Sequence, residues 1–143
     1  MSTLRDLCEK YPALLLGAVS ETELTLRAVE EALSIRLPED VRWFLVTCGY
    51  GAVNAIPNIR NALADTLRFR TALGLDLRYV VLNDMNDAGV VLLDTSCAAG
   101  PVIWMDAHLA GLLPNGKLPP ESFERFEGFS DWVTDRTLEL LSE

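Results

Sequence analysis

The chain carries the stretch VEEALSIRLPED at residues 29–40, in which one predicted helix ends and the next begins. Before the break, apolar residues recur at helical spacing on one face: Leu26, Val29 and Leu33. Residues 34–37 interrupt this pattern, and Pro38 suits the first turn of the following helix because an N–H is not needed there. We therefore interpret the Leu-Pro-Glu-Asp sequence as a device that sets helix geometry, and not as a site.

The chain before this stretch predicts two helices. Apolar residues at positions i, i+3, i+4 and i+7 give a short amphipathic helix that Pro12 ends: Leu4, Leu7, Cys8 and Tyr11. Ser20 and Glu23 form a capping-box pattern. The helix that runs through Val29 is therefore expected to begin at Ser20.

The chain after the stretch predicts two more helices with a strand between them. The helix that starts near Pro38 repeats the apolar spacing and should end at Gly49: Val41, Phe44, Leu45 and Cys48. Residues 50–56 predict a short strand. Residues 57–73 predict a helix that ends at Gly74, with Leu67 among its inward-facing residues.

Short apolar runs separated by turn-forming residues follow: Tyr79 to Leu82, Val90 to Leu93 and Pro101 to Met105. They predict an antiparallel meander, and their lack of clean alternation indicates that helices cover much of the sheet. Residues 109–120 predict a loop, 122–126 an edge strand and 130–141 a closing helix. The predicted fold class is α+β, a single domain over residues 1–143 with helices packed on a mostly antiparallel sheet.

Composition favours a globular protein of the cytoplasm. Half of the 143 residues are apolar, and no apolar run approaches the roughly 20 residues that a membrane span requires. Residues 1–10 carry acids and lack the apolar core of a signal peptide. Cys8, Cys48 and Cys97 are odd in number and widely spaced, which favours small core residues in a reducing compartment over a disulfide framework.

The formal net charge of −9 argues against nucleic acid as a ligand and favours a basic protein partner. Within residues 83–106 the chain has no Lys or Arg, and all four charged residues are acidic: Asp84, Asp87, Asp94 and Asp106. We take these four as candidate partner-binding residues. The alternative is that they cap turns or improve solubility.

Two loops imitate ligand-binding motifs. Residues 111–117 imitate a phosphate-binding loop, but Leu118 stands where a hydroxyl must reach magnesium, and Pro119 and Pro120 replace the required helix. Residues 84–89 begin like a calcium loop, but Ala88 lacks an oxygen ligand there, which favours a turn. We expect neither a metal nor a cofactor.

A catalytic trio of Cys97, His108 and Asp106 is conceivable, because a thiolate needs an adjacent base and that base an orienting carboxylate. The sequence does not favour this trio, since Cys97 lies in an Ala/Gly loop and a chain of this length offers such a trio by chance. We therefore expect no catalytic residues.

The stretch at residues 29–40, followed by Trp43-Phe44-Leu45 and Gly49, resembles the signature of the SUKH superfamily of Smi/Knr-type domains. The resemblance covers nearly the whole chain, since the later segments occur in the order of such domains: Thr66-Leu67-Arg68, Tyr79 to Asp84, Leu93-Asp94, Pro101 to Trp104 and Phe129 to Val133.

The resemblance implies a binding role without catalytic residues. Many bacterial members are immunity proteins that neutralise polymorphic toxins, often nucleases, whereas fungal relatives act as regulatory scaffolds. It therefore implies a non-enzymatic immunity protein that binds a cognate toxin. The alternative is a regulatory or scaffold protein of the same fold that binds another partner.

Overall fold

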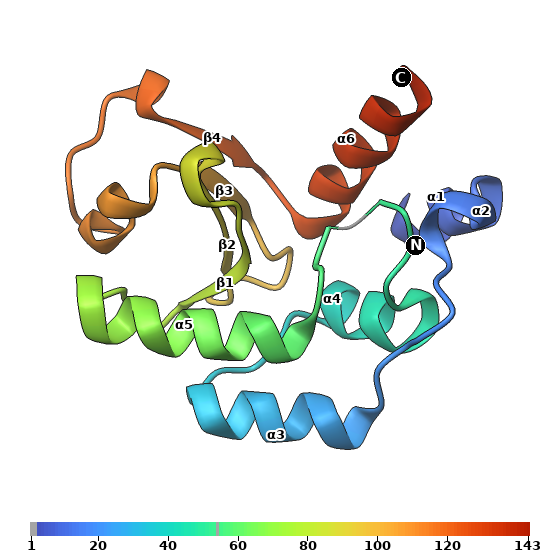
Figure 1. Cartoon of the computed structure of the whole chain (residues 1–143), viewed down its shortest axis with the longest axis horizontal. Coiled ribbons are helices and arrows are strands. Elements are labelled where there is room, and N and C mark those ends of the chain that lie inside the picture. Colours follow the sequence, from blue (N-terminus) through green and yellow to red (C-terminus); the bar gives the residue numbers. More distant parts are fainter. Residues whose placement is uncertain (1–2, 54) are drawn as a thin grey trace.

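The computed structural model describes residues 3–53 and 55–143. Within these residues, strands in the order β1-β2-β3-β4 form one antiparallel sheet (Figure 1). Their bounds are β1 Tyr79–Asp84, β2 Val90–Asp94, β3 Val102–Met105 and β4 Phe123–Phe126. The predicted α+β class, the meander and the edge strand are thus confirmed.

Helices pack around this sheet (Figure 1). Their bounds are α1 Thr3–Lys10, α2 Pro12–Leu15, α3 Glu23–Leu33, α4 Glu39–Trp43, α5 Ile59–Leu73 and α6 Phe129–Leu141. A π-helical segment, η1 (Phe44–Cys48), continues α4 directly. Short 3-10 segments are η2 Asn86–Ala88, η3 Ala107–Leu112 and η4 Pro120–Ser122.

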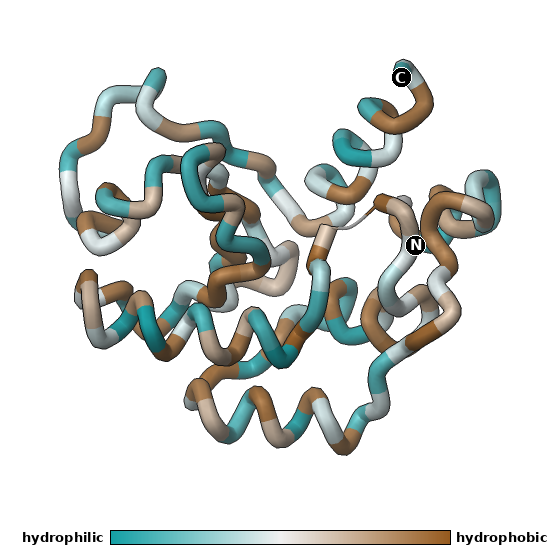
Figure 2. Tube along the Cα trace, in the orientation of Figure 1, coloured by the Kyte–Doolittle hydropathy of each residue, from teal (hydrophilic) through white to brown (hydrophobic). Residues whose placement is uncertain are grey.

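Both faces of the sheet are buried. On one face, Val80, Val91 and Val102 join a core with residues of α1, α3, α4, η1 and α6. On the other face, Val81 and Leu92 join a second core with Phe69 of α5 and Ala110 of η3. Burial on both sides explains why the strands read as continuous apolar runs. The α3 and α5 traces instead alternate between hydrophobic and hydrophilic residues (Figure 2), as expected for helices that bury one side only.

The joint between α3 and α4 is built around the carboxylate of Glu30. One of its oxygens accepts a hydrogen bond from the backbone N–H of Leu37 at 2.7 Å. The other forms an ion pair with Arg42, which also pairs with Glu23. Ser34 ends α3 in the left-handed conformation with φ 56°. The predicted helix, break and second helix are therefore correct.

The start of α3 differs from the prediction. Thr22, not Ser20, caps the helix, because its hydroxyl oxygen accepts the N–H of Thr25 at 3.2 Å. Pro12 ends α1 as predicted, and it also begins the short α2.

Residues 50–53, 55 and 56 form turns, so the predicted strand is wrong; Asn54 lies outside the described residues. The backbone of this segment bonds to α2 and to the chain that follows it: Val53 N–H donates to the carbonyl of Leu14 at 3.1 Å, and Tyr50 N–H donates to the carbonyl of Val19 at 3.1 Å. Val53, Ala55 and Ile56 are buried all the same. Burial of an irregular segment produced the apolar pattern that predicted a strand.

Three further expectations are corrected. Leu67 is 44% exposed, because the buried face of α5 is formed by other residues. This face includes Ala62, Thr66 and Phe69. The 3-10 segment η3 covers residues 109–112 of the predicted loop. Cys97 is exposed, whereas Cys8 and Cys48 are buried as expected.

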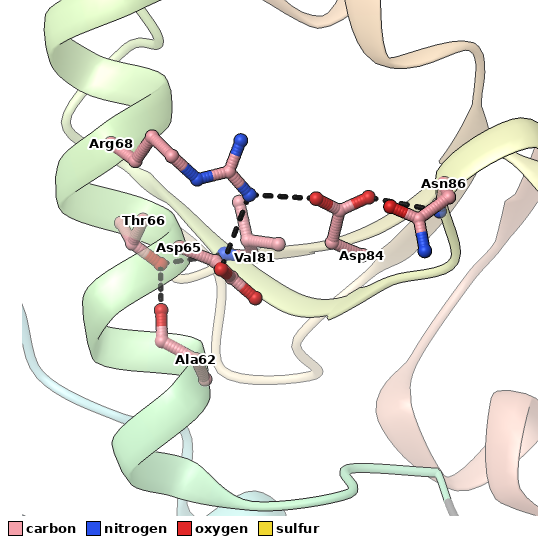
Figure 3. Close-up of polar contacts among 7 residues, drawn as sticks. All are labelled: Ala62, Asp65, Thr66, Arg68, Val81, Asp84 and Asn86. Carbon is pink, nitrogen blue, oxygen red and sulfur yellow. Dashed lines mark hydrogen bonds and ion pairs between the residues drawn. The ribbon is translucent and has the colours of Figure 1, made fainter.

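Thr66 connects α5 to the edge strand β1 (Figure 3). Its hydroxyl donates to the carbonyl of Ala62 at 2.6 Å and accepts the backbone N–H of Val81 at 2.9 Å. Because Thr66 is fully buried, this N–H is satisfied by a side chain and not by water.

Replacing Glu30 with Ala should lower the free energy of unfolding by about 2–3 kcal/mol, because the Leu37 N–H and the Arg42 guanidinium both lose a part-buried partner. Urea denaturation measures this change. The control is Glu23→Ala, which removes the more exposed partner of Arg42 and should cost about 0.2–1 kcal/mol. Equal losses in the two variants would contradict the central role of Glu30.

Replacing Thr66 with Val keeps the shape of the side chain but leaves the Val81 N–H without an acceptor, and should cost about 1–3 kcal/mol of stability. The matched control is Thr71→Val on the same helix. Thr71 donates only to Leu67 in an exposed setting, so this change should stay within about 0.5 kcal/mol. Thermal and urea denaturation compare the two variants. An equally small effect at Thr66 would contradict its role in connecting α5 to β1.

Candidate protein-binding surface

The register of the sheet brings three of the four candidate aspartates to one end. Asp84 pairs with Val90, Val90 with Met105, and Met105 with Phe123. Asp87 lies in η2 between β1 and β2, and Asp106 directly follows β3. Asp94 pairs with Tyr79 at the opposite end of the sheet. The four residues therefore do not form one surface.

Asp84 is neutralised by a cation and caps a turn (Figure 3). One carboxylate oxygen pairs with Arg68 at 2.7 Å, and the other accepts the backbone N–H of Asn86 at 3.0 Å. The bond to Asp84 raises the pKa of Arg68, and a second bond to Asp65 adds to this. Asp84 thus shapes the β1–β2 turn, and both of its oxygens are occupied by protein donors.

Asp94 is 8% exposed and also serves a turn. Its carboxylate accepts the backbone N–H of Ser96 at 2.9 Å and the Ser96 hydroxyl at 2.6 Å. Both bonds reach Oδ1, and burial of the side chain leaves little of the carboxylate open to a partner. The alternative interpretation, that acids of the second half cap turns, fits the geometry of Asp84 and Asp94.

Asp87 and Asp106 are exposed. The η2 turn that carries Asp87 is fixed to β3, because the Trp104 indole N–H donates to the carbonyl of Ala88 at 2.8 Å. Gly89 permits this approach: its φ is 101°, and a Cβ there would lie 2.7 Å from the Met105 carbonyl oxygen. Both acids are therefore held on a rigid part of the sheet.

Two glutamates that sequence reasoning missed lie beside Asp106. Glu121 and Glu124 are exposed, and with Asp106 and Trp104 they line a shallow depression of about 380 Å³. Among the described residues that line it, none is basic. The observation that reveals their position is the pairing of β3 with β4, which sets Glu124 opposite Trp104. We call Asp87, Asp106, Glu121 and Glu124 the acidic end of the sheet.

A family model described as SUKH_5, SMI1-KNR4 cell-wall, matches residues 5–138. The chain belongs to the SUKH superfamily. A comparison with curated proteins gives no significant match. Domains of the SUKH superfamily are generally non-catalytic, and the superfamily is consistent with an immunity-type binding role.

The structure of this SUKH chain separates the conceivable catalytic trio. Cys97 lies in the turn before β3, whereas Asp106 and His108 follow β3. The strand between them has four residues and spans about 13 Å at ordinary rise. A thiolate at Cys97 therefore has neither His108 nor Asp106 within hydrogen-bonding distance.

The two ligand-like loops form turns. Residues 84–89 fold around η2, with both oxygens of Asp84 occupied by protein donors. The loop through Lys117 leads into the three-residue η4 where a nucleotide site needs a long helix. Over the described ranges, 3–53 and 55–143, no group of three or more His, Cys, Asp or Glu residues could hold a metal ion. No helix in that part of the chain is long and apolar enough to cross a membrane.

Asp94 and Asp87 should respond differently to replacement by Ala. Asp94→Ala removes two hydrogen bonds at a buried position and should lower the free energy of unfolding by about 1–3 kcal/mol. Asp87→Ala should change it by less than about 0.5 kcal/mol, because Asp87 is exposed. Chemical denaturation measures both changes. An unchanged free energy of unfolding in Asp94→Ala would mean that Asp94 does not stabilise the turn and remains a candidate for partner binding.

Proposed function

We propose that this SUKH protein is a non-enzymatic immunity protein of the cytoplasm that binds and neutralises a cognate toxin through the acidic end of the sheet. The observation that carries the proposal is the gathering of Asp87, Asp106, Glu121 and Glu124 at one end, with no basic residue among those described around the depression. The family match supports a binding role.

Electrostatics favours a basic protein as the partner. A net charge of −9 gives the molecule a field that attracts cations and repels phosphates, so nucleic acid and anionic membrane surfaces are not the proposed ligands. The acidic end places part of this charge on a fixed surface. Acids facing the basic rim of a toxin, such as a nuclease, would accelerate association and orient the two proteins.

Apolar atoms at the same place would hold the complex together. Trp104 and Phe123 are half-buried and line the depression beside the acids. Aromatic residues that are partly exposed and rigidly supported often dominate binding energy, whereas charges at the rim act mainly on association rates. Trp104 is rigid because its indole bonds to Ala88 and its ring packs on Trp132 with centroids 6.2 Å apart.

The match to the SMI1-KNR4 cell-wall family favours one alternative: a regulatory or scaffold protein whose partner is not a toxin. Gene context separates the two functions. An immunity gene lies beside the gene of a toxin, and its deletion is tolerated only when the toxin is absent. Deletion of a scaffold gene would have the same effect on the cell whether or not a toxin gene is present.

The double variant Asp87→Asn/Asp106→Asn should bind an inactivated toxin domain encoded by the neighbouring gene with an association rate about 3–10-fold lower at low salt. The difference should shrink at physiological salt because exposed charges are screened. Stopped-flow mixing or surface plasmon resonance gives these rates. The expected loss is in the association rate because both acids are exposed.

The control is Asp6→Asn/Glu9→Gln on α1, which removes the same charge from exposed positions far from β3 and β4 (Figure 1). It should leave the rate nearly unchanged. Equal slowing in both variants would mean that net charge alone matters. An unaffected Asp87/Asp106 variant that still binds tightly would place the interface elsewhere.

A further inference from the structure

Two buried thiols from distant parts of the chain lie in contact. The sulfur atoms of Cys8 in α1 and Cys48 at the end of η1 are 2.8 Å apart, although the residues are 40 positions apart in sequence. Cys8 is 8% exposed and Cys48 1% exposed. A disulfide bond is about 2.05 Å long, so the sulfur atoms need to approach by only ~0.8 Å.

The backbone around this pair is held in place. The Cys48 carbonyl accepts the N–H of Gly17 at 2.9 Å, in the segment that follows α1 and α2. Gly49 packs so closely on the same segment that a Cβ there would lie 2.0 Å from the Val19 carbonyl oxygen. These contacts fix the segment after α2 against the end of η1, beside the point at which α1 brings Cys8 into contact with Cys48.

The pair lies close to the surface, where Cys8 remains 8% exposed. Cys8 and Cys48 both line a surface depression of about 380 Å³, beside Arg5, Pro12, Trp43 and Thr47. Cys97, in contrast, is exposed in the turn between β2 and β3 and has Ser96 as its neighbour. The third thiol therefore lies outside this contact.

The surroundings assign different roles to the two thiols. Burial raises the pKa of Cys8 above its ordinary value, and the hydrogen bond from Cys48 partly offsets this. Burial raises the pKa of Cys48 well above its ordinary value, and the contact with Cys8 raises it further. Cys8 is more accessible and forms its thiolate more readily, so it is the attacking thiol and Cys48 the resolving thiol.

We propose that Cys8 and Cys48 are a redox modification site that forms a reversible intramolecular disulfide by exchange with a low-molecular-weight disulfide. The Cys8 thiolate attacks one sulfur of the small disulfide, and a small thiolate leaves. The Cys48 thiolate then attacks the Cys8 sulfur, and the second small thiolate leaves. The protein loses two hydrogens, the small disulfide is reduced to two thiols, and the two protein protons pass to the released thiolates.

The bond would tie α1 to η1 and enclose the α3–α4 joint in a covalent loop. The expected consequence is a more stable fold, because a long closed loop restricts the unfolded chain. The reduced protein folds without the bond, as Cys8 and Cys48 are then small core residues. The disulfide is therefore an additional state of the protein and not a requirement for folding.

The test uses the folded 143-residue chain with Cys97→Ser, so that only the buried pair can react. After incubation with oxidised glutathione, the intact mass should fall by two hydrogens, both thiols should be lost without dimerisation, and the melting temperature should rise by roughly 5–15 °C. Dithiothreitol should reverse all three changes. The rate should rise with pH from 7 to 9, because the raised pKa values leave little thiolate at neutral pH.

Cys8→Ala and Cys48→Ala in the same background are the controls, and neither should lose two hydrogens or gain thermal stability. Circular dichroism establishes that both remain folded. The proposal is overturned if the folded Cys97→Ser protein keeps both thiols after long exposure to oxidised glutathione. It is also overturned if the bond forms only in denaturant, or if the oxidised protein melts at a lower temperature than the reduced one.

Discussion

The arrangement of the helices depends on the carboxylate of Glu30, which makes two contacts at once. Glu30 must satisfy the backbone N–H of Leu37, which the break in the chain leaves without a helical partner, and must also balance the charge of Arg42. Because both contacts come from the same side chain, the break and the direction of α4 are fixed together. The buried face that begins at Val41 and continues through η1 then lies under the sheet. Ser34 completes the turn with a conformation that few side chains adopt.

The meander converts sequence order into spatial grouping. Residues just after β1, just after β3 and just before β4 arrive at one end of the sheet, while residues just after β2 arrive at the other. Acids that are scattered along the second half of the chain are therefore sorted into two places. The acidic end of the sheet remains exposed beside Trp104. At the other end, Asp94 is buried and accepts hydrogen bonds from the local turn. The exposed group, and not the acidic composition as a whole, is the basis of the proposed partner binding.

Local patterns predicted the elements well where one rule decided the outcome. The break after Leu33, the helix end at Gly74 and the strands of the meander follow from residue chemistry and periodicity. Prediction failed where distant backbone took part. Residues 50–56 predicted a strand because the backbone contacts of Tyr50 and Val53 with α2 and the chain after it cannot be seen in a local window. The same limit applies to the site: without strand register, Asp94 looked equivalent to Asp87, and Glu121 and Glu124 had no apparent role.

The contact between Thr66 and Val81 has a consequence for the behaviour of the molecule in a crowded solution. An edge strand normally presents N–H and C=O groups to which a strand of another molecule can add, and this addition is a common first step of aggregation. At β1, the helix α5 lies along the edge, and the Thr66 hydroxyl already occupies the Val81 N–H. The helix thereby closes this edge of the sheet to strand addition, and one hydroxyl protects an otherwise hydrophobic strand from intermolecular pairing.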